Sequence, residues 1–146
     1  MKTVYSSSRA HCFLYTLYSR SQLNVNIIRG ENFPLISSSN VSFTYVVVEL
    51  RPFSQKYEAK AQTHYVRNSV SPLFNDNINY QIQAKDLDNQ TLCLSVYDIN
   101  HLSAHDLIGC VKLKFVGQKI ESGLKMFFRE KLKWEGDAEV SWYSLV

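Results

Sequence analysis

The chain has 146 residues and a mass of 16.9 kDa, which fits one domain with a full hydrophobic core. A composition of 45% hydrophobic and 20% charged residues excludes a disordered chain or a fibre. The net charge of +3 falls short of the basic bias of a dedicated nucleic-acid binder, so no nucleic-acid partner is expected. All six aspartates lie beyond position 75. The first half of the chain therefore lacks the side chain that hard cations use most.

Targeting signals and cysteine usage indicate a compartment. Residues 1–10 contain no long apolar stretch before a cleavage site, and nowhere do about 18 uncharged apolar residues run together. Cys12, Cys93 and Cys110 are an odd number of cysteines without metal-ligand spacing, which favours free thiols in a reducing compartment. We therefore expect an intracellular protein, with residues 1–10 as a tail and residues 11–146 as one folded domain.

Short segments rich in aromatic and β-branched residues recur between polar breaks, a pattern typical of an all-β sandwich. The predicted strands are Cys12–Tyr18, Gln22–Arg29, Thr44–Arg51, Tyr57–Tyr65, Phe74–Ile82, Thr91–Asp98, Leu107–Phe115 and Glu139–Leu145. Apolar and polar residues alternate clearly in several of them, so that one face of each such strand enters the core. Turn-forming pairs such as Ser71-Pro72 separate the strands.

One segment, from Ser122 to Trp134, departs from the β pattern. Its residues fall at helical spacing, with Leu124, Phe127, Phe128 and Leu132 on one side and Lys125, Arg129 and Lys133 on the other. This spacing predicts one amphipathic helix whose apolar side packs on the sandwich. A helix lying on a membrane surface is the alternative, although three nearby glutamates dilute its positive charge.

Several motifs resemble, in order and spacing, those of the C2 domain family of the synaptotagmin-like type. They are Leu23–Pro34 (LNVNIIRGENFP), Tyr45–Pro52, Asn68–Asn75 (NSVSPLFN), Val96–Asn100, Asp106–Gly109 and Trp142–Leu145. The chain is similar to this family from about Cys12 to Leu145, and its last part looks like the second C2 domain of a tandem pair. The resemblance implies an eight-stranded antiparallel β-sandwich, with one amphipathic helix before the last strand, whose loops at one end meet membranes or partners.

The resemblance also implies a calcium site, and this chain departs from its pattern. The ligand positions, two in the first loop and the others in the third, fall on Ser37, Phe43, Asp98, Asn100, Ser103 and Asp106. The family pattern has five aspartates at these positions, with Ser103 at a further ligand position. Only two of the five, Asp98 and Asp106, remain here, and a phenyl ring cannot coordinate calcium. We therefore expect no metal and no cofactor, with Asp98 and Asp106 kept for hydrogen bonds within the loops.

Two other roles for the same region stay open. His101 and His105 are close in sequence to the two aspartates, but an irregular loop does not hold them on one face, so a zinc site is disfavoured. Phe43, together with some of the apolar residues in these loops, has the alternative role of filling the space that a metal ion leaves.

A lipid site is implied beside the fourth strand, where related domains hold a lysine-rich cluster. The candidate residues are Lys56, Lys60, His64, Arg67, Tyr45 and Tyr97, with apolar loop tips at Leu35, Ile36, Val41 and Leu102. Val47 and Gln62 stand where lipid-binding relatives have lysine. At about 1 kcal/mol per basic residue near an anionic surface, such a cluster gives only millimolar binding.

Catalysis has no support, because the chain has no nucleophile elbow, phosphate loop or His-Glu-x-x-His helix, and we do not expect an enzyme.

The leading hypothesis is a calcium-independent C2 module for weak docking to anionic phospholipids, including phosphoinositides, and for protein interaction in vesicle traffic or signalling. It would be cytoplasmic or peripheral to a membrane, with a nuclear location also open. The alternative is a protein interaction domain with no lipid role, using an edge of the sandwich, the predicted helix, or the terminus Ser144–Val146, whose form a PDZ groove reads. The sequence does not indicate an oligomeric state.

Overall fold

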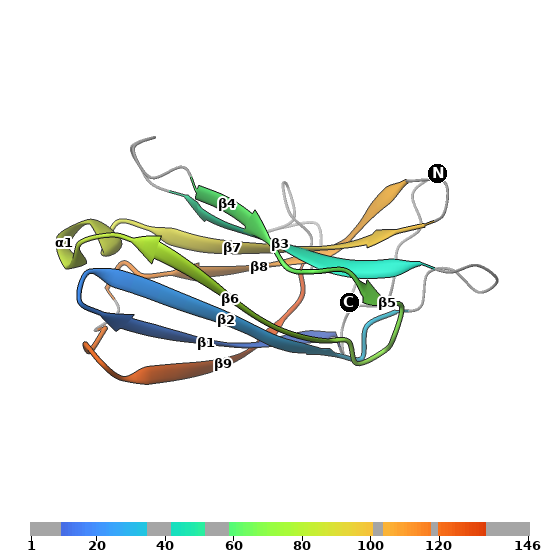
Figure 1. The fold of residues 1–146 in the computed structure, drawn as a ribbon, viewed down its shortest axis with the longest axis horizontal. Helices are drawn as coiled ribbons and strands as arrows, with labels where there is room; N and C mark the ends of the chain where they lie inside the picture. The colour runs from blue at the N-terminus through green and yellow to red at the C-terminus, as the bar shows by residue number, and fades with distance from the viewer. Residues whose placement is uncertain (1–9, 35–41, 52–58, 101–103, 118–119, 134–146) are drawn as a thin grey trace.

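The computed structural model describes residues 10–34, 42–51, 59–100, 104–117 and 120–133, which form two stacked antiparallel sheets (Figure 1). The elements are β1 (His11–Ser19), β2 (Gln22–Glu31), β3 (Phe43–Arg51), β4 (Ala59–Gln62), β5 (Val66–Arg67), β6 (Leu73–Gln81), α1 (Ala84–Leu87), β7 (Thr91–Ile99), β8 (His105–Lys114) and β9 (Lys125–Lys131). Sheet A has the order β6-β2-β1-β9, and sheet B has the order β4-β3-β7-β8 with β5 also paired to β3. The predicted all-β antiparallel sandwich is therefore confirmed.

Strict alternation along the central strands explains how the two sheets pack. In β1, every second residue from Cys12 to Tyr18 is buried, and in β3 the inward residues Thr44, Val46, Val48 and Leu50 are buried in the same way. Successive side chains of a strand point to opposite faces, so these residues form the layer between the sheets. Each apolar side chain that is fully buried contributes about 1.5–3 kcal/mol, which makes this layer the main source of stability.

A tight turn joins β1 to β2 at one end of the sandwich. Ser19 pairs with Gln22, and the two residues between them, Arg20 and Ser21, have φ values of 53° and 61°. A two-residue hairpin loop with positive φ at both positions is a type I′ turn, whose twist matches that of the strands. Arg20 and Ser21 adopt this left-handed conformation although asparagine and glycine fit it better.

The predicted amphipathic helix is wrong. Residues Lys125–Lys131 form β9, which pairs with β1 and occupies the edge of sheet A. The run Met126-Phe127-Phe128 fits both a helical period and a strand period, and short apolar runs do not separate the two. Pairing with β1 supplies backbone hydrogen bonds and turns Met126 and Phe128 inward, so tertiary packing overrides the helical spacing. The predicted strand Glu139–Leu145 lies outside the described residues.

The sheets are joined where the chain leaves β9. The Leu132 amide donates a hydrogen bond to the carbonyl of Ala10, the residue before β1 of sheet A (2.9 Å), and the Lys133 amide donates one to the carbonyl of Cys110 in sheet B (2.8 Å). Leu132 is fully buried at this crossing. A Cβ atom at Gly109 would lie 2.9 Å from the Leu132 Cβ and 3.2 Å from the Lys133 carbonyl oxygen, so the crossing requires a residue without a side chain.

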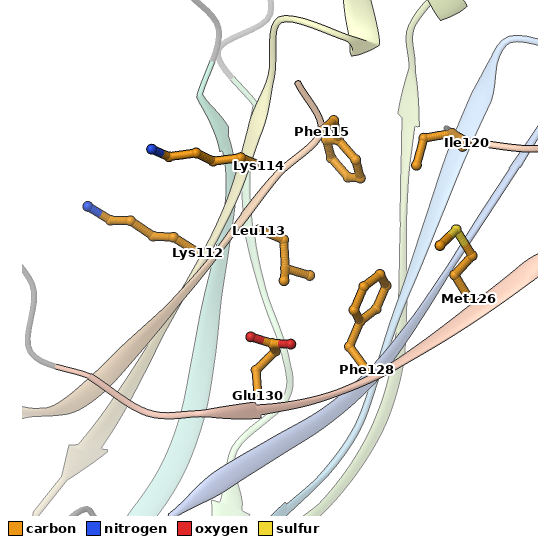
Figure 2. Close-up of a pocket in the computed structure, with 8 residues that line it drawn as sticks. All are labelled: Lys112, Leu113, Lys114, Phe115, Ile120, Met126, Phe128 and Glu130. Atoms are coloured by element: carbon orange, nitrogen blue, oxygen red, sulfur yellow. The ribbon is translucent and has the colours of Figure 1, made fainter. Parts of the chain in front are cut away.

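A cleft of about 380 Å³ opens between β8 and β9 (Figure 2). Its apolar lining consists of Leu113, Phe115, Ile120, Met126 and Phe128, while Glu130 closes one side. Figure 2 shows Lys112 and Lys114 pointing away from the cleft. In the part of the chain that the structure describes, no helix is long and apolar enough to cross a membrane.

Candidate functional site

At the end of the sandwich opposite the Arg20-Ser21 turn, the chain leads from β2 to β3, from β5 to β6, and from β7 to β8. The Asn68 amide donates a hydrogen bond to the Ser42 carbonyl, and the Phe33 amide donates one to the Val70 carbonyl, both at 2.9 Å. The first two connections are therefore tied together, and we call this region the loop end.

Asp98 lies on the inner side of β7 at the loop end and is 1% exposed. Neither carboxylate oxygen has a hydrogen-bond partner among the described residues. Burial raises the pKa of Asp98, and the charge of Asp106, its cross-strand neighbour, raises it further. The Ser42 hydroxyl is near enough to oppose this rise, but no hydrogen bond of good geometry joins the two side chains. The predicted hydrogen-bonding role of Asp98 therefore stays a prediction.

The described part of the predicted calcium site fits calcium poorly. Phe43 offers no oxygen, and the Asn100 Oδ1 atom already accepts a hydrogen bond from the Ala104 amide at 3.2 Å. Phe43 is 37% exposed and shares the outer side of β3 with Tyr45, so it does not fill an interior space. Calcium needs six to eight oxygen ligands, whereas this set supplies the carboxylates of Asp98 and Asp106.

Tyr45 is the centre of an aromatic cluster on the outer face of sheet B. Its ring stacks on Tyr97 at 5.5 Å between centroids, and it meets the edges of Tyr65 (5.1 Å) and His105 (5.7 Å). The Tyr45 hydroxyl oxygen lies 2.6 Å from His105 Nδ1. Burial raises the pKa of Tyr45, with smaller contributions from Tyr65 and Tyr97. The predicted pair Tyr45 and Tyr97 is thus brought together, and the Tyr45 hydroxyl is used within the cluster.

The predicted basic cluster is divided by the strand register. Arg67 pairs with Phe43, whereas Lys60 pairs with Glu49, six residues further along β3. At about 3.4 Å per residue, the backbone positions of the two residues are about 20 Å apart. Glu49 also holds Arg51 in an ion pair of 3.3 Å, so Lys60 lies beside a carboxylate. Lys60 and Arg67 therefore do not lie side by side on sheet B.

The third candidate, His64, is held by a residue of sheet A. Its Nδ1 atom is 2.6 Å from the Asp76 carboxylate, and its backbone amide donates a hydrogen bond to the same oxygen at 2.9 Å. Asp76 belongs to β6 in sheet A, so this pair links the edges of the two sheets. The other predicted residues, Ser37, Ser103, Lys56, Leu102 and the apolar tips at Leu35, Ile36 and Val41, lie outside the described residues.

Sequence reasoning missed exposed apolar side chains at the loop end. Tyr65 is 51% exposed, Val70 is almost equally open, and Leu73 is more exposed than either. Val70 and Leu73 belong to the NSVSPLFN motif. This motif predicts a turn and does not indicate that its apolar side chains are exposed. With Phe43 and Arg67, these residues give the loop end an apolar surface with a positive charge.

An antiparallel sandwich whose connections carry apolar and cationic side chains at one end defines a class of recognition modules built on a rigid scaffold. The C2 domain model matches residues 21–129, and the chain belongs to the C2 domain family. It is a C2 domain of the synaptotagmin-like type. Domains of this type generally act as membrane and protein interaction modules and are typically not enzymes.

Relatives and solved structures agree with this assignment. The chain is 31% identical to synaptotagmin-2 of Homo sapiens over 108 residues, which cover 71% of this chain and 25% of that protein. It is 36% identical to synaptotagmin-3 of Rattus norvegicus over 97 residues, 66% of this chain and 16% of that protein. A C2 domain of RIM from Drosophila has a TM-score of 0.69 at 21% identity, covering 84% of this chain and 98% of that domain. The first C2 domain of human synaptotagmin XIII has a TM-score of 0.59 at 16% identity, covering 90% and 94%. The chain thus spans a quarter or less of these synaptotagmins.

Proposed function

We propose that this chain is a calcium-independent C2 module that docks weakly on anionic phospholipid membranes through its loop end. The observation that carries the proposal is the gathering of Phe43, Tyr65, Val70 and Arg67 at that end of a C2 sandwich. Exposed apolar patches on soluble domains mark membrane or protein interaction sites. No step of this binding requires a nucleophile or an acid–base pair, so the module binds and does not catalyse.

The expected affinity is low. Arg67 contributes about 1 kcal/mol near an anionic surface, and an apolar side chain contributes about 1.5–3 kcal/mol when it is fully inserted. Since these side chains are already partly buried, two or three of them, together with Arg67, give a total of about 4–6 kcal/mol, which is a dissociation constant between about 1 mM and about 40 μM. Linkage to a second module raises such an affinity by about 10²–10⁴. We therefore infer a role in positioning a larger protein at a cytoplasmic membrane surface.

Calcium independence follows from the donor set. With Phe43 in a ligand position and Asp98 buried, the described residues offer too few accessible carboxylates to offset the dehydration of a divalent ion. Binding to vesicles is therefore expected to be equal in calcium and in chelator.

Co-sedimentation with vesicles of phosphatidylcholine, phosphatidylserine and phosphatidylinositol bisphosphate tests the proposal. We expect binding at low salt that falls at about 300 mM salt, and a loss of about fivefold or more in the Arg67→Glu and Val70→Ser variants. Lys60→Glu is the matched control, because its backbone position lies about 20 Å from that of Arg67 and it should change binding less than about twofold. Equal losses in both charge variants, or binding that needs calcium, would overturn the proposed site. Absence of binding at low salt would leave protein interaction as the function.

A further inference from the structure

The strand β1 is apolar on both of its faces. Cys12, Leu14, Thr16 and Tyr18 point into the core, while the outward positions between them are Phe13, Tyr15 and Leu17. An antiparallel strand with one solvated face normally alternates apolar and polar residues, and near-continuous apolar sequence is typical of strands covered on both sides. The outer face of sheet A therefore has the composition of a surface that another molecule covers.

Pairing with β9 extends this apolar surface. The register places Phe127 beside Tyr15, Lys125 beside Leu17, and Arg129 beside Phe13. The rings of Tyr15 and Phe127 lie 5.5 Å apart between centroids. Phe127 is nevertheless 68% exposed, more than any other large hydrophobic side chain in the described residues. The apolar centre of the face is thus open to solvent.

Cations surround this apolar centre. Arg29 lies 3.8 Å and Arg129 5.7 Å from the centroid of the Phe13 ring, and Lys125 lies 4.8 Å from that of Tyr15. Lys131 completes the set, because it pairs with His11 on the same side of the sheet. Four cations thus stand against one described carboxylate on this face.

The one described carboxylate on this face, that of Glu31, is bound by two of the cations. Glu31 accepts a hydrogen bond from Arg129 at 2.8 Å and lies 3.8 Å from Arg29. The two guanidinium groups therefore converge on a carboxylate while they cover an aromatic ring, which is an arrangement suited to an acidic residue beside an apolar one.

The other half of the face carries neutral amides. Register pairs Asn24 with Asn79 and Asn26 with Asn77, all on the outer side of β2 and β6. The Asn77 and Asn79 side chains are exposed. Side-chain amides are costly to insert into lipid, whereas they exchange hydrogen bonds readily with the N–H and C=O groups of a peptide main chain.

We propose that this aromatic–basic face, made by Phe13, Tyr15, Leu17, Phe127, Arg29, Lys125 and Arg129, binds an acidic, extended segment of a partner protein. The length of β9 is about 20 Å, which matches about six residues of extended chain. A second copy of this chain does not fit, since two such faces would bring like charges together. The inference does not depend on the proposed membrane site, because the loop end and this face use different residues.

Selection from a displayed library of random peptides of about 12 residues, followed by fluorescence anisotropy with the enriched peptides, tests the proposal. We expect enrichment of acidic residues around an aromatic or aliphatic residue. Binding of an enriched peptide should fall about tenfold or more in the Phe127→Ser variant, in the Arg129→Gln variant, and when its acids are replaced by amides. Lys112→Gln is the matched control, because Lys112 belongs to β8 in sheet B, and Arg67→Glu should also leave peptide binding unchanged.

Four results would overturn the proposal. They are no acidic enrichment, binding that is insensitive to Phe127→Ser, vesicle binding lost on Phe127→Ser, and self-association in sedimentation velocity that Phe127→Ser removes. The third result would assign the face to membranes and the fourth to a second copy. Thermal unfolding of each variant accompanies these measurements, and Phe127→Ser is expected to fold because the side chain is mostly exposed.

Discussion

The outer faces of the two sheets both carry aromatic rings and cations, but they use them in opposite ways. On sheet B, Tyr45 is enclosed by Tyr65, Tyr97 and His105, and its hydroxyl meets His105 at 2.6 Å. On sheet A, Phe127 touches Tyr15 yet stays open to solvent. Rings that satisfy one another stabilise the fold, whereas rings that are left open are available to a partner.

Removal of one ring from each face should therefore have unequal consequences. Tyr45→Ala leaves a gap beneath three neighbouring rings and should cost about 3 kcal/mol of unfolding free energy. Phe127→Ala removes a mostly exposed ring and should cost less than about 1 kcal/mol. Urea denaturation of both variants measures the difference. Equal losses would show that the face of sheet A is part of the structural core, and would break the distinction between the two faces.

The alternation that predicts a sandwich is visible in single strands, which is why most of the fold could be read from the sequence. The pattern of Leu23, Val25 and Ile27 specifies the inner face of β2 whatever the strand pairs with. The prediction of a helix over Lys125–Lys131 was wrong because the apolar run fits both the helical period and the strand period. Pairing with β1 decides between them. That pairing joins residues about a hundred or more positions apart, so no local pattern contains it.

The candidate site was less predictable for the same reason. Lys60 and Arg67 look like one cluster because they are close in sequence, but the register with β3 separates them. Conversely, Tyr45 and His105 are 60 positions apart and meet only because β3 and β8 both flank β7. Residue type identified Asp98 as a candidate, whereas its burial without a partner depends on the packing of both sheets.

The second expected effect concerns Asp98, which lies on the inner side of sheet B, beneath the face that carries Tyr45. Its folded-state pKa is raised, so the folded protein takes up this proton more readily than the unfolded chain does. The stability contributed by the neutral form is present at acid pH and is lost as pH rises through the raised pKa. Above that pKa the charged Asp98 side chain therefore destabilises the fold.

Asp98→Asn should remove that penalty and, above the raised pKa, increase the unfolding free energy by about 1–2 kcal/mol, the range typical of relieving an uncompensated buried charge. The difference from the wild type should shrink as pH falls through that pKa. Urea denaturation between about pH 4 and 8 measures it, with Asp88→Asn as the control because Asp88 is exposed and lies at the end of α1. A variant that is less stable than the wild type at every pH would show that the Asp98 carboxylate makes a stabilising interaction in the folded state.

The smallest expected effect comes from one matched substitution on both faces. Tyr45→Phe deletes a hydroxyl that lies 2.6 Å from His105, whereas no hydrogen bond of the Tyr15 hydroxyl is found within the described residues. A hydrogen bond between side chains contributes about 0.5–1.5 kcal/mol net, so Tyr45→Phe should cost about 1 kcal/mol and Tyr15→Phe close to nothing. The double variant with His105→Ala isolates the pair, because the cost of Tyr45→Phe should vanish once His105 is absent. If Tyr15→Phe were the more destabilising of the two, sheet A would hold its aromatic rings by polar contacts as sheet B does, and its face would be closed to an incoming peptide.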